Sequence, residues 1–343
     1  MNAEQAGSGS GRVAVGVYDF SYGPYALGDA LTWSMNLACL AADRGCDGVD
    51  QVLFIDPKRP SSRYQPFITG LTAPAAIDAL LPGFLCTPGL RSLKVLRDAP
   101  TFHRFLWRDG FRRPMWPSLW QQLNRQLDQV SHFRINAFWR KHGQLPRLQA
   151  PRGHLGTARA WLAKAAPGRF TVAVNLRQSV RAPLPANLFR DAPLPEWYAF
   201  FDAAARSHPD TLFVLLGGYG EWDRRLLRLP NLTIPRREGL GLGEELALVT
   251  LADMFMGSSS GFAAMATFAD RPYLITKVEH LFARYVEVPV GAAHYPFGAA
   301  HQRLLWCEDE RDLLMAEFVA LRARIDEGIA AGRIAGSPSG AAS

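Results

Sequence analysis

The chain has 343 residues, 48% of them hydrophobic, which is normal for a soluble globular protein and predicts two domains of ordinary size. No apolar run approaches the roughly 20 residues that a membrane-spanning helix needs, which excludes an integral helical membrane protein. The net charge of +7 favours an anionic partner, either a small ligand, a membrane surface or nucleic acid.

The four cysteines form no CxxC pair, and no His, Cys and carboxylate cluster has the spacing of a metal site. The first observation favours reduced thiols in a cytoplasmic protein. Residues 1–11 lack the charged and then apolar layout of a signal peptide, and we expect them to be disordered.

The first half of the chain begins with the order strand, helix, strand, which we expect at 12–18, 29–44 and 49–55. In the proline-rich stretch that follows, 75–81 and 90–96 are compatible with either a short helix or a strand.

Further along, a proline at the start and a glycine just past the end predict one long amphipathic helix over 117–142. A Pro-rich and basic segment at 144–154 shows no periodicity, and we place the domain boundary there.

The second half alternates strands with helices. Strands are expected at 170–176, 211–216, 231–234, 253–257 and 273–276. Helices are expected at 155–166, 195–207, 243–251, 261–269 and 309–330. This alternation is typical of a parallel, doubly wound sheet.

We therefore predict an α/β protein with two doubly wound, Rossmann-like domains that face each other over a cleft. The amino-terminal domain is expected at 12–147 and the carboxy-terminal domain at 148–331, followed by a disordered tail at 332–343.

A turn of small residues between an expected strand and an expected helix is the most informative motif. Gly257 and Gly261 enclose three serines, Ser258, Ser259 and Ser260. A helix that starts at such a turn points backbone N–H groups and a positive dipole at one spot, and serine hydroxyls add donors without bulk. The turn predicts a phosphate site, although turns of this kind also serve as plain connectors.

A second glycine turn, with Gly217, Gly218 and Gly220, follows the apolar run 212–216. Glycines allow a ligand to approach the backbone closely. Glu221 could bond ribose hydroxyls or be an acid at a helix start. The two turns together suggest a nucleotide or diphosphate pocket at the strand ends.

Two charged residues are candidates for the chemistry. Gly28 would allow a tight turn into the first helix, and Asp29 would then lie in its first turn, either as a base that takes a proton from an acceptor hydroxyl or as a plain cap. Arg177 follows Asn175 at the end of the strand that opens the second half. It would either grip a phosphate at the carboxyl edge of the sheet or be a surface arginine.

The segment 102–141 interleaves arginines with aromatic residues. This pattern suits single-stranded nucleic acid or an anionic membrane, and equally a helix with core aromatics and solvated arginines. Core packing is favoured for 117–142, and the less regular part, 102–116, is the better candidate for surface contact.

These motifs resemble those of the GT-B glycosyltransferases, in particular the heptosyltransferase-like enzymes. The run 27–31 resembles that family's Gly-Asp entry into the first helix, where the aspartate is the proposed base. The runs 214–220 and 244–247, and the serine turn followed by Pro272, resemble its carboxy-terminal motifs.

This chain departs from the family's Asp-Ser-Gly and histidine, having Ser259 in place of the acid and Ala264 and Met265 where the histidine would fall. The element 175–177 is similar to the arginine-bearing strand of fucosyltransferase-type GT-B enzymes.

The resemblance implies a glycosyltransferase of bacterial glycan or glycoconjugate synthesis. It would move a sugar from a nucleotide-diphosphate donor, with no further cofactor and no metal, to a glycan, lipid-linked or protein hydroxyl. Asp29 and Arg177 would be catalytic, and Gly28, Asn175, Gly217, Gly218, Glu221 and Ser258 to Gly261 would bind the donor.

The protein would be cytoplasmic, with 102–116 in peripheral contact with the inner face of the membrane, and nucleic acid is disfavoured as a partner. The alternatives are another enzyme on this scaffold, such as a pyruvyl transferase or a sugar epimerase, and a non-catalytic protein that binds RNA or membrane.

Overall fold

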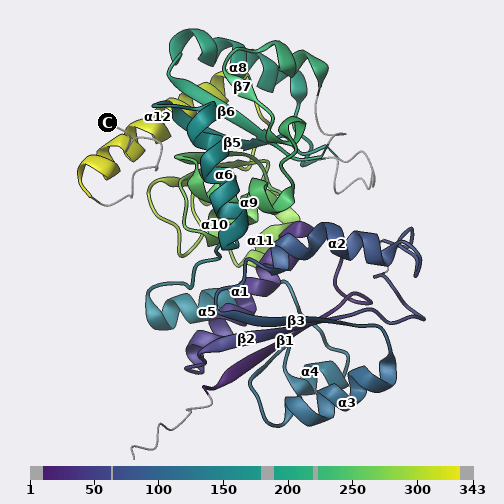
Figure 1. The fold of residues 1–343 in the computed structure, drawn as a ribbon. Coiled ribbons are helices and arrows are strands. Elements are labelled where there is room, and N and C mark those ends of the chain that lie inside the picture. The colour runs from purple at the N-terminus through teal and green to yellow at the C-terminus, as the bar shows by residue number, and fades with distance from the viewer. Residues whose placement is uncertain (1–10, 63–64, 179–188, 219–222, 333–343) are drawn as a thin grey trace, which may run out of the picture.

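The computed structural model describes residues 11–62, 65–178, 189–218 and 223–332. It contains two parallel β-sheets, each with its own helical layers, stacked one above the other (Figure 1). The predicted α/β architecture with two doubly wound domains is confirmed.

The amino-terminal sheet has the strand order β3-β2-β1-β4, with all neighbouring pairs parallel. Its strands are β1 (Val13–Asp19), β2 (Gly48–Phe54), β3 (Leu90–Leu96) and β4 (Met115–Trp116). The centre of this sheet is covered on both faces, which is why β1 is an almost unbroken apolar run.

Successive residues of β1 point to opposite faces. Ala14 and Tyr18 pack with the helices α1 (Leu27–Asp43) and α2 (Ala73–Phe84). Val15 and Val17 pack with α3 (Ala99–Gly110) and with Leu119 of α4 (Leu119–Leu123). The layer of α3 and α4 lies on the side of the sheet that faces away from the other domain (Figure 1).

The carboxy-terminal sheet has the strand order β10-β9-β8-β5-β6-β7. Its strands are β5 (Phe170–Asn175), β6 (Thr211–Leu216), β7 (Leu232–Thr233), β8 (Met254–Ser258), β9 (Tyr273–Thr276) and β10 (Gln302–Leu304). The chain runs outward from β5 to β7, then returns to β8 on the other side of β5. The order of the strands therefore reverses between β5 and β8.

Helices cover both faces of this second sheet. They are α6 (Arg152–Ala165), α8 (Leu194–Ser207), α9 (Leu242–Leu251), α10 (Gly261–Phe268), α11 (His280–Val286) and α12 (Arg311–Ala330), with 3-10 turns at Arg224–Arg228 and Pro235–Glu238. Within the described residues, no helix is both long and apolar enough to cross a membrane.

The two domains are joined by an apolar cluster that crosses the boundary between them. Leu31 and Met35 of α1 belong to the same buried cluster as Phe262 and Ala266 of α10. The helices α1 and α2 contact α10 and α9, respectively. The first helix of the chain is therefore a structural part of the interface as well as of its own domain.

The prediction of a single helix over 117–142 is wrong. The chain forms the short α4 and then α5 (Phe133–His142), separated by nine residues without helix. Arg125 takes the left-handed conformation with φ 53°, and the Ser131 N–H donates to Asp128 Oδ1 at 3.1 Å. These local turns interrupt a pattern whose amphipathic spacing alone favours a continuous helix.

The description of 102–116 as irregular is also corrected, because most of it belongs to α3. Two segments were compatible in sequence with either a helix or a strand. In the structure, 75–81 lies within the helix α2 and 90–96 forms the strand β3.

Candidate active site

The strand order reverses between β5 and β8, and the crevice at the carboxyl ends of two such strands is the usual ligand position in open α/β sheets. Asn175 ends β5 and pairs with Gly257 of β8. Arg177 follows the first strand and the serine turn follows the second. The structure therefore brings together two motifs that are about 80 residues apart in the sequence.

Gly257 allows the two strand ends to approach closely. Its φ is 152°, and a Cβ there would lie 2.4 Å from the carbonyl oxygen of Asn175. The Asn175 side chain donates from Nδ2 to the carbonyl of Leu216, at 3.2 Å, and so joins the end of β5 to that of β6. These contacts give Asn175 and Gly257 a structural role at the base of the crevice.

The first turn of α1, from the amino-terminal domain, lies against the start of α10. A Cβ on Gly28 would lie 3.6 Å from the Cα of Gly261, and a Cβ on Gly261 would lie 2.6 Å from Leu27 Cβ. The Gly-Asp motif and the serine turn are therefore adjacent across the domain boundary. The contact with Leu27 also gives Gly261 a packing role.

Asp29 lies in the first turn of α1 and is half-buried there. It is not the cap of the helix, because the N-cap residue is Ala26, which makes no side-chain capping bond. Loss of hydration raises the pKa of Asp29 to about 6, and the positive charge of Arg190 partly opposes this rise. Its carboxylate is therefore a stronger base than an exposed aspartate and is mainly ionised at neutral pH.

Arg190 is the charged group that links the two domains electrostatically. Its guanidinium lies 3.6 Å from Glu279, and Asp29 and Arg177 both act on it. Burial, followed by repulsion from Arg177, lowers the pKa of Arg190. Two guanidinium groups that repel each other in a crevice favour an anion that both can bind.

Arg177 lies at the carboxyl edge of the sheet and donates from Nη1 to Asp191 Oδ1 at 2.8 Å. Lys277, after β9, donates from Nζ to the Asp191 carbonyl at 2.9 Å and to Glu308 at 2.6 Å. Lys277 has the left-handed φ of 51° and a side chain only 5% exposed. The cationic groups of the crevice are thus held in place by carboxylates, and a bound phosphate would compete with those carboxylates.

The three serines of the turn are in different environments. Ser258 Oγ is buried and has no hydrogen-bond partner within the described structure. The Ser259 N–H already donates to the carbonyl of Thr276 at 2.9 Å. Ser260 caps α10 by accepting from the Ala263 N–H at 3.3 Å. The Ser258 hydroxyl is therefore enclosed, and the donors that this turn offers to a ligand are the backbone N–H groups at the start of α10.

The glycine turn after β6 is supported from beneath by a buried carboxylate. Gly217 has φ 122°, and its N–H donates to Glu245 Oε1 at 3.0 Å. Arg236 donates to the other oxygen of Glu245 at 2.5 Å. Gly218 has open space where a Cβ would lie, and Glu221 is outside the described residues.

Sequence reasoning missed Arg190, Lys277 and Glu279. None of them belongs to a recognisable motif, and only the path of the chain between β5 and α8 and the turn after β9 bring them to the crevice. No group of three or more His, Cys, Asp and Glu side chains suited to a metal occurs within the described part of the chain.

No family model and no curated protein matches the chain in sequence. Its structure is similar to that of the E. coli ADP-heptose LPS heptosyltransferase II, with TM-score 0.54 and 10% identity over 92% of this chain and 99% of that one. The fold is GT-B.

Less similar structures are a family 9 glycosyl transferase from Veillonella parvula (TM-score 0.49, 9% identity, 93% of this chain and 96% of that one) and a putative UDP-N-acetylglucosamine 2-epimerase from Listeria monocytogenes (TM-score 0.44, 7% identity, 92% and 88%). At such identities the likeness concerns the GT-B fold alone.

Proposed function

We propose that this protein is a glycosyltransferase that moves a sugar from a nucleotide-diphosphate donor to a hydroxyl acceptor. The observation that carries this proposal is the position of Asp29. The Asp29 carboxylate, from one domain, is half-buried and has a raised pKa. It interacts electrostatically with the guanidinium of Arg190, from the other domain. This arrangement lies beside the strand-order reversal, where GT-B folds and other open α/β sheets have room for a ligand.

In the proposed reaction the acceptor oxygen forms a bond to the anomeric carbon as the bond from that carbon to the diphosphate breaks. The acceptor proton passes to Asp29, and the electron pair leaves with the diphosphate. Arg177 and Arg190 would stabilise the negative charge on the leaving group, with the backbone N–H groups at the start of α10 as further donors. The raised pKa of Asp29 suits a base that works near neutral pH.

We further propose that transfer needs no bound metal, because Arg177, Arg190 and Lys277 supply positive charge where the diphosphate would lie. Turnover that is unchanged by a chelator such as EDTA is the expected result. Loss of turnover on chelation, with recovery on adding a divalent cation, would contradict this part of the proposal.

The donor nucleotide is defined only by class. The E. coli neighbour is named for ADP-heptose, so ADP-sugars are the first to test, together with GDP- and UDP-sugars. The acceptor would be a glycan, a lipid-linked sugar or a protein hydroxyl, met in the cytoplasm at the inner face of a membrane.

A thermal-shift screen with ADP, GDP, UDP and CMP tests the nucleotide site, because a ligand that binds the native state raises its melting temperature. One nucleotide should raise the melting temperature of the wild type and fail to do so for Arg190→Ala. The matched control is Arg159→Ala, which removes an exposed arginine of α6.

Product analysis with the nucleotide-sugar of the base so identified then separates transfer from epimerisation. A glycosylated acceptor and free nucleoside diphosphate support the proposal. An epimerised sugar still attached to its nucleotide would contradict it.

A further inference from the structure

A cationic cavity, remote from the candidate active site, opens at the amino end of β1. It has a volume of about 340 Å³ and is lined by five arginines and no carboxylate: Arg12, Arg44, Arg112, Arg113 and Arg134. The volume lies within the range of small-ligand pockets. Arginine is the preferred side chain for binding phosphate groups, because its planar fork donates two parallel hydrogen bonds.

Most of this positive charge is not neutralised by the protein. Arg113 is paired, with Asp50 at 2.5 Å and Asp109 at 3.3 Å. In the described part of the chain, the other four arginines of the cavity form no ion pair with a carboxylate. The nearby Asp43 pairs with Lys141 and His142 instead. A multivalent anion would therefore find unpaired donors on several sides.

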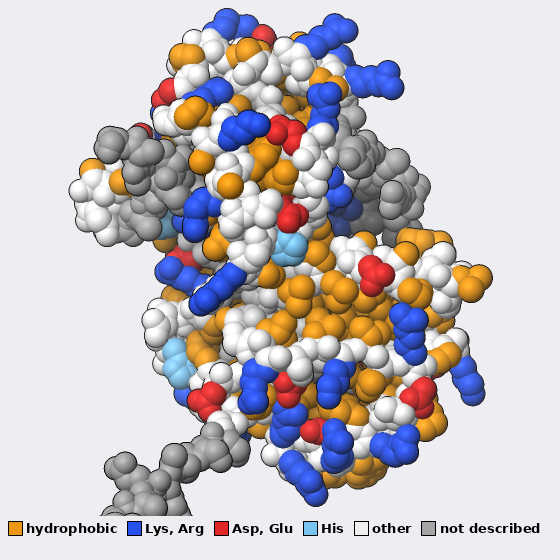
Figure 2. All heavy atoms as spheres, viewed as in Figure 1, with side chains coloured by type: hydrophobic (Ala, Val, Ile, Leu, Met, Phe, Trp, Pro, Cys, Tyr) orange, Lys and Arg blue, Asp and Glu red, His pale blue; other side chains and the backbone are white. Residues whose placement is uncertain are grey.

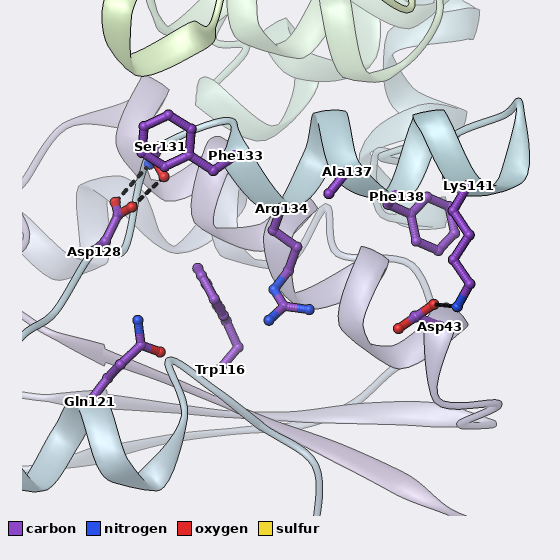
Figure 3. Close-up of a pocket in the computed structure, with 10 residues that line it drawn as sticks. All are labelled: Asp43, Trp116, Gln121, Asp128, Ser131, Phe133, Arg134, Ala137, Phe138 and Lys141. Atoms are coloured by element: carbon purple, nitrogen blue, oxygen red, sulfur yellow. Dashed lines mark hydrogen bonds and ion pairs between the residues drawn. The ribbon is translucent and has the colours of Figure 1, made fainter.

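Arg134 is held in this cavity although burial is unfavourable for it. It lies over the ring of Trp116, with the guanidinium carbon 4.7 Å from the ring centroid. Arg134 also lines a neighbouring cavity of about 410 Å³. Figure 3 shows this neighbouring cavity, with the Arg134 guanidinium pointing from α5 toward the sheet. Its Nε is buried without a hydrogen-bond partner within the described structure. An anion at this position would compensate the loss of hydration.

This cavity cannot be part of the sugar-transfer site. Arg44 follows the last turn of α1, whereas Asp29 lies in its first turn. Fifteen helical residues separate two such positions by roughly 22 Å at 1.5 Å per residue. A ligand in the arginine cavity is therefore a different molecule, or a distant part of a large one.

An exposed aromatic face adjoins the cavity. Trp107 and Phe111 are 56% and 68% exposed and stack on each other with ring centroids 5.4 Å apart. We call these two residues the aromatic face. Phe111 also lines the cavity, so the two features are continuous.

The surroundings of the aromatic face are basic. Arg104 and Arg108 of α3 are exposed. Figure 2 shows several Lys and Arg side chains around hydrophobic ones at the end of the molecule where α3 and α4 lie. Exposed tryptophan and phenylalanine among arginines are typical of surfaces that lie in the headgroup region of an anionic bilayer.

We propose that the arginine cavity binds the phosphate-bearing headgroup of an anionic membrane lipid while the aromatic face inserts into the bilayer interface. The charge of the cavity selects the headgroup, and Trp107 and Phe111 supply the apolar anchor. Two such signals together give stable peripheral attachment where either one alone is marginal. The α3–α4 end of the amino-terminal domain then faces the membrane.

Sedimentation with lipid vesicles tests this inference on the full chain. The wild type should bind vesicles that contain phosphatidylglycerol and bind pure phosphatidylcholine weakly. Arg44→Glu and Arg112→Glu should each weaken binding to the anionic vesicles by roughly fivefold or more. Trp107→Ser should weaken binding to both kinds of vesicle. An unchanged melting temperature shows that each variant folds.

Arg159→Glu is the matched control, because it reverses an exposed arginine of the other domain. Equal weakening by this control would overturn the inference, since binding would then depend on net charge alone. Inorganic phosphate that stabilises the wild type but not Arg44→Glu, without vesicle binding, would assign the cavity to a soluble anion. Oligonucleotide binding that requires Arg44 and Arg112, in the absence of vesicle binding, would equally overturn it.

The inference does not depend on the proposed enzymatic function. Asp29→Asn should bind anionic vesicles like the wild type while losing turnover. Vesicle binding without turnover, or turnover without vesicle binding, therefore shows which of the two proposals has failed.

Discussion

Gly28 and Gly261 bring the first turns of two helices from different domains into contact. A Cβ on Gly28 would lie 3.6 Å from the Cα of Gly261. The positive ends of the α1 and α10 dipoles are therefore close together, near Asp29 and the serine turn. The geometry of the candidate site thus depends on how these two helices pack.

Gly261→Ala should destabilise the protein by about 1–3 kcal/mol. The new Cβ would lie 2.6 Å from Leu27 Cβ, an atom that cannot rotate away, so α1 and α10 would have to separate. Urea unfolding measures the effect. Gly156→Ala is the control, because this glycine of α6 has open space around it. The control should gain about 0.5–1 kcal/mol, and an equal loss in both variants would contradict the packing argument.

Gly28→Ala should leave the stability nearly unchanged, because the added Cβ would make ordinary contacts at 3.6 Å and beyond. A drop in turnover in this stable variant would then report on the space needed by substrate. Destabilisation as large as that of Gly261→Ala would contradict the distance between α1 and α10 on which this prediction rests.

Asp29→Asn should increase stability at pH 8 by about 3 kcal/mol and have little effect near pH 4. The folded pKa of about 6 is higher than the ordinary value of 3.8, so the native state binds this proton more tightly than the unfolded chain. The unfolding free energy therefore falls as the pH rises from about 4 to about 6. Asparagine removes this penalty. Unfolding curves of both proteins at several pH values measure it, and a constant difference would contradict the raised pKa.

Arg190→Ala should lower turnover by roughly tenfold or more. In the profile of turnover against pH, it should also move the fall in turnover on the acid side to higher pH. The reason is that the charge of Arg190 lowers the pKa of Asp29, so its removal lets that pKa rise further. Arg177→Ala should lower turnover by a similar factor. The check is turnover as a function of pH, and a fall on the acid side that does not move would show that Arg190 does not act on the base.

Glu245→Gln should cost roughly 1–3 kcal/mol, the usual effect of leaving one buried hydrogen-bond donor without an acceptor. Glu245 is fully buried and neutralises Arg236 while accepting the Gly217 N–H. Glutamine has one acceptor oxygen where the carboxylate has two, so either the Gly217 N–H or Arg236 loses its hydrogen bond to residue 245. The double variant with Arg236→Met should recover much of the loss, whereas additive losses in a double-mutant cycle would show that the two residues do not form one unit.

The strands of the carboxy-terminal domain were predictable because strands covered on both faces are continuous apolar runs. The run 211–216 matches β6 at both ends, and the serine turn is where α10 begins. The break between α4 and α5 was not predictable, since the left-handed Arg125 has no signature in its own residue type.

The candidate site was predictable only in part. Gly28, Asp29 and the serine turn belong to local motifs, and the structure brings them together. Arg190 follows no strand and belongs to no motif, so its place beside Asp29 depends on the tertiary path of the chain. The role of Leu27 in covering Gly261 is likewise a contact between domains that no local pattern encodes.

The most direct test of the central claim is release of nucleoside diphosphate, coupled to glycosylation of an acceptor, by the wild type and by Asp29→Asn at neutral pH. The exposed Asp78→Asn of the same domain serves as the matched control. The account predicts turnover by the wild type and the control and almost none by Asp29→Asn. Equal turnover by all three proteins would contradict the role of Asp29 as the base at the domain boundary.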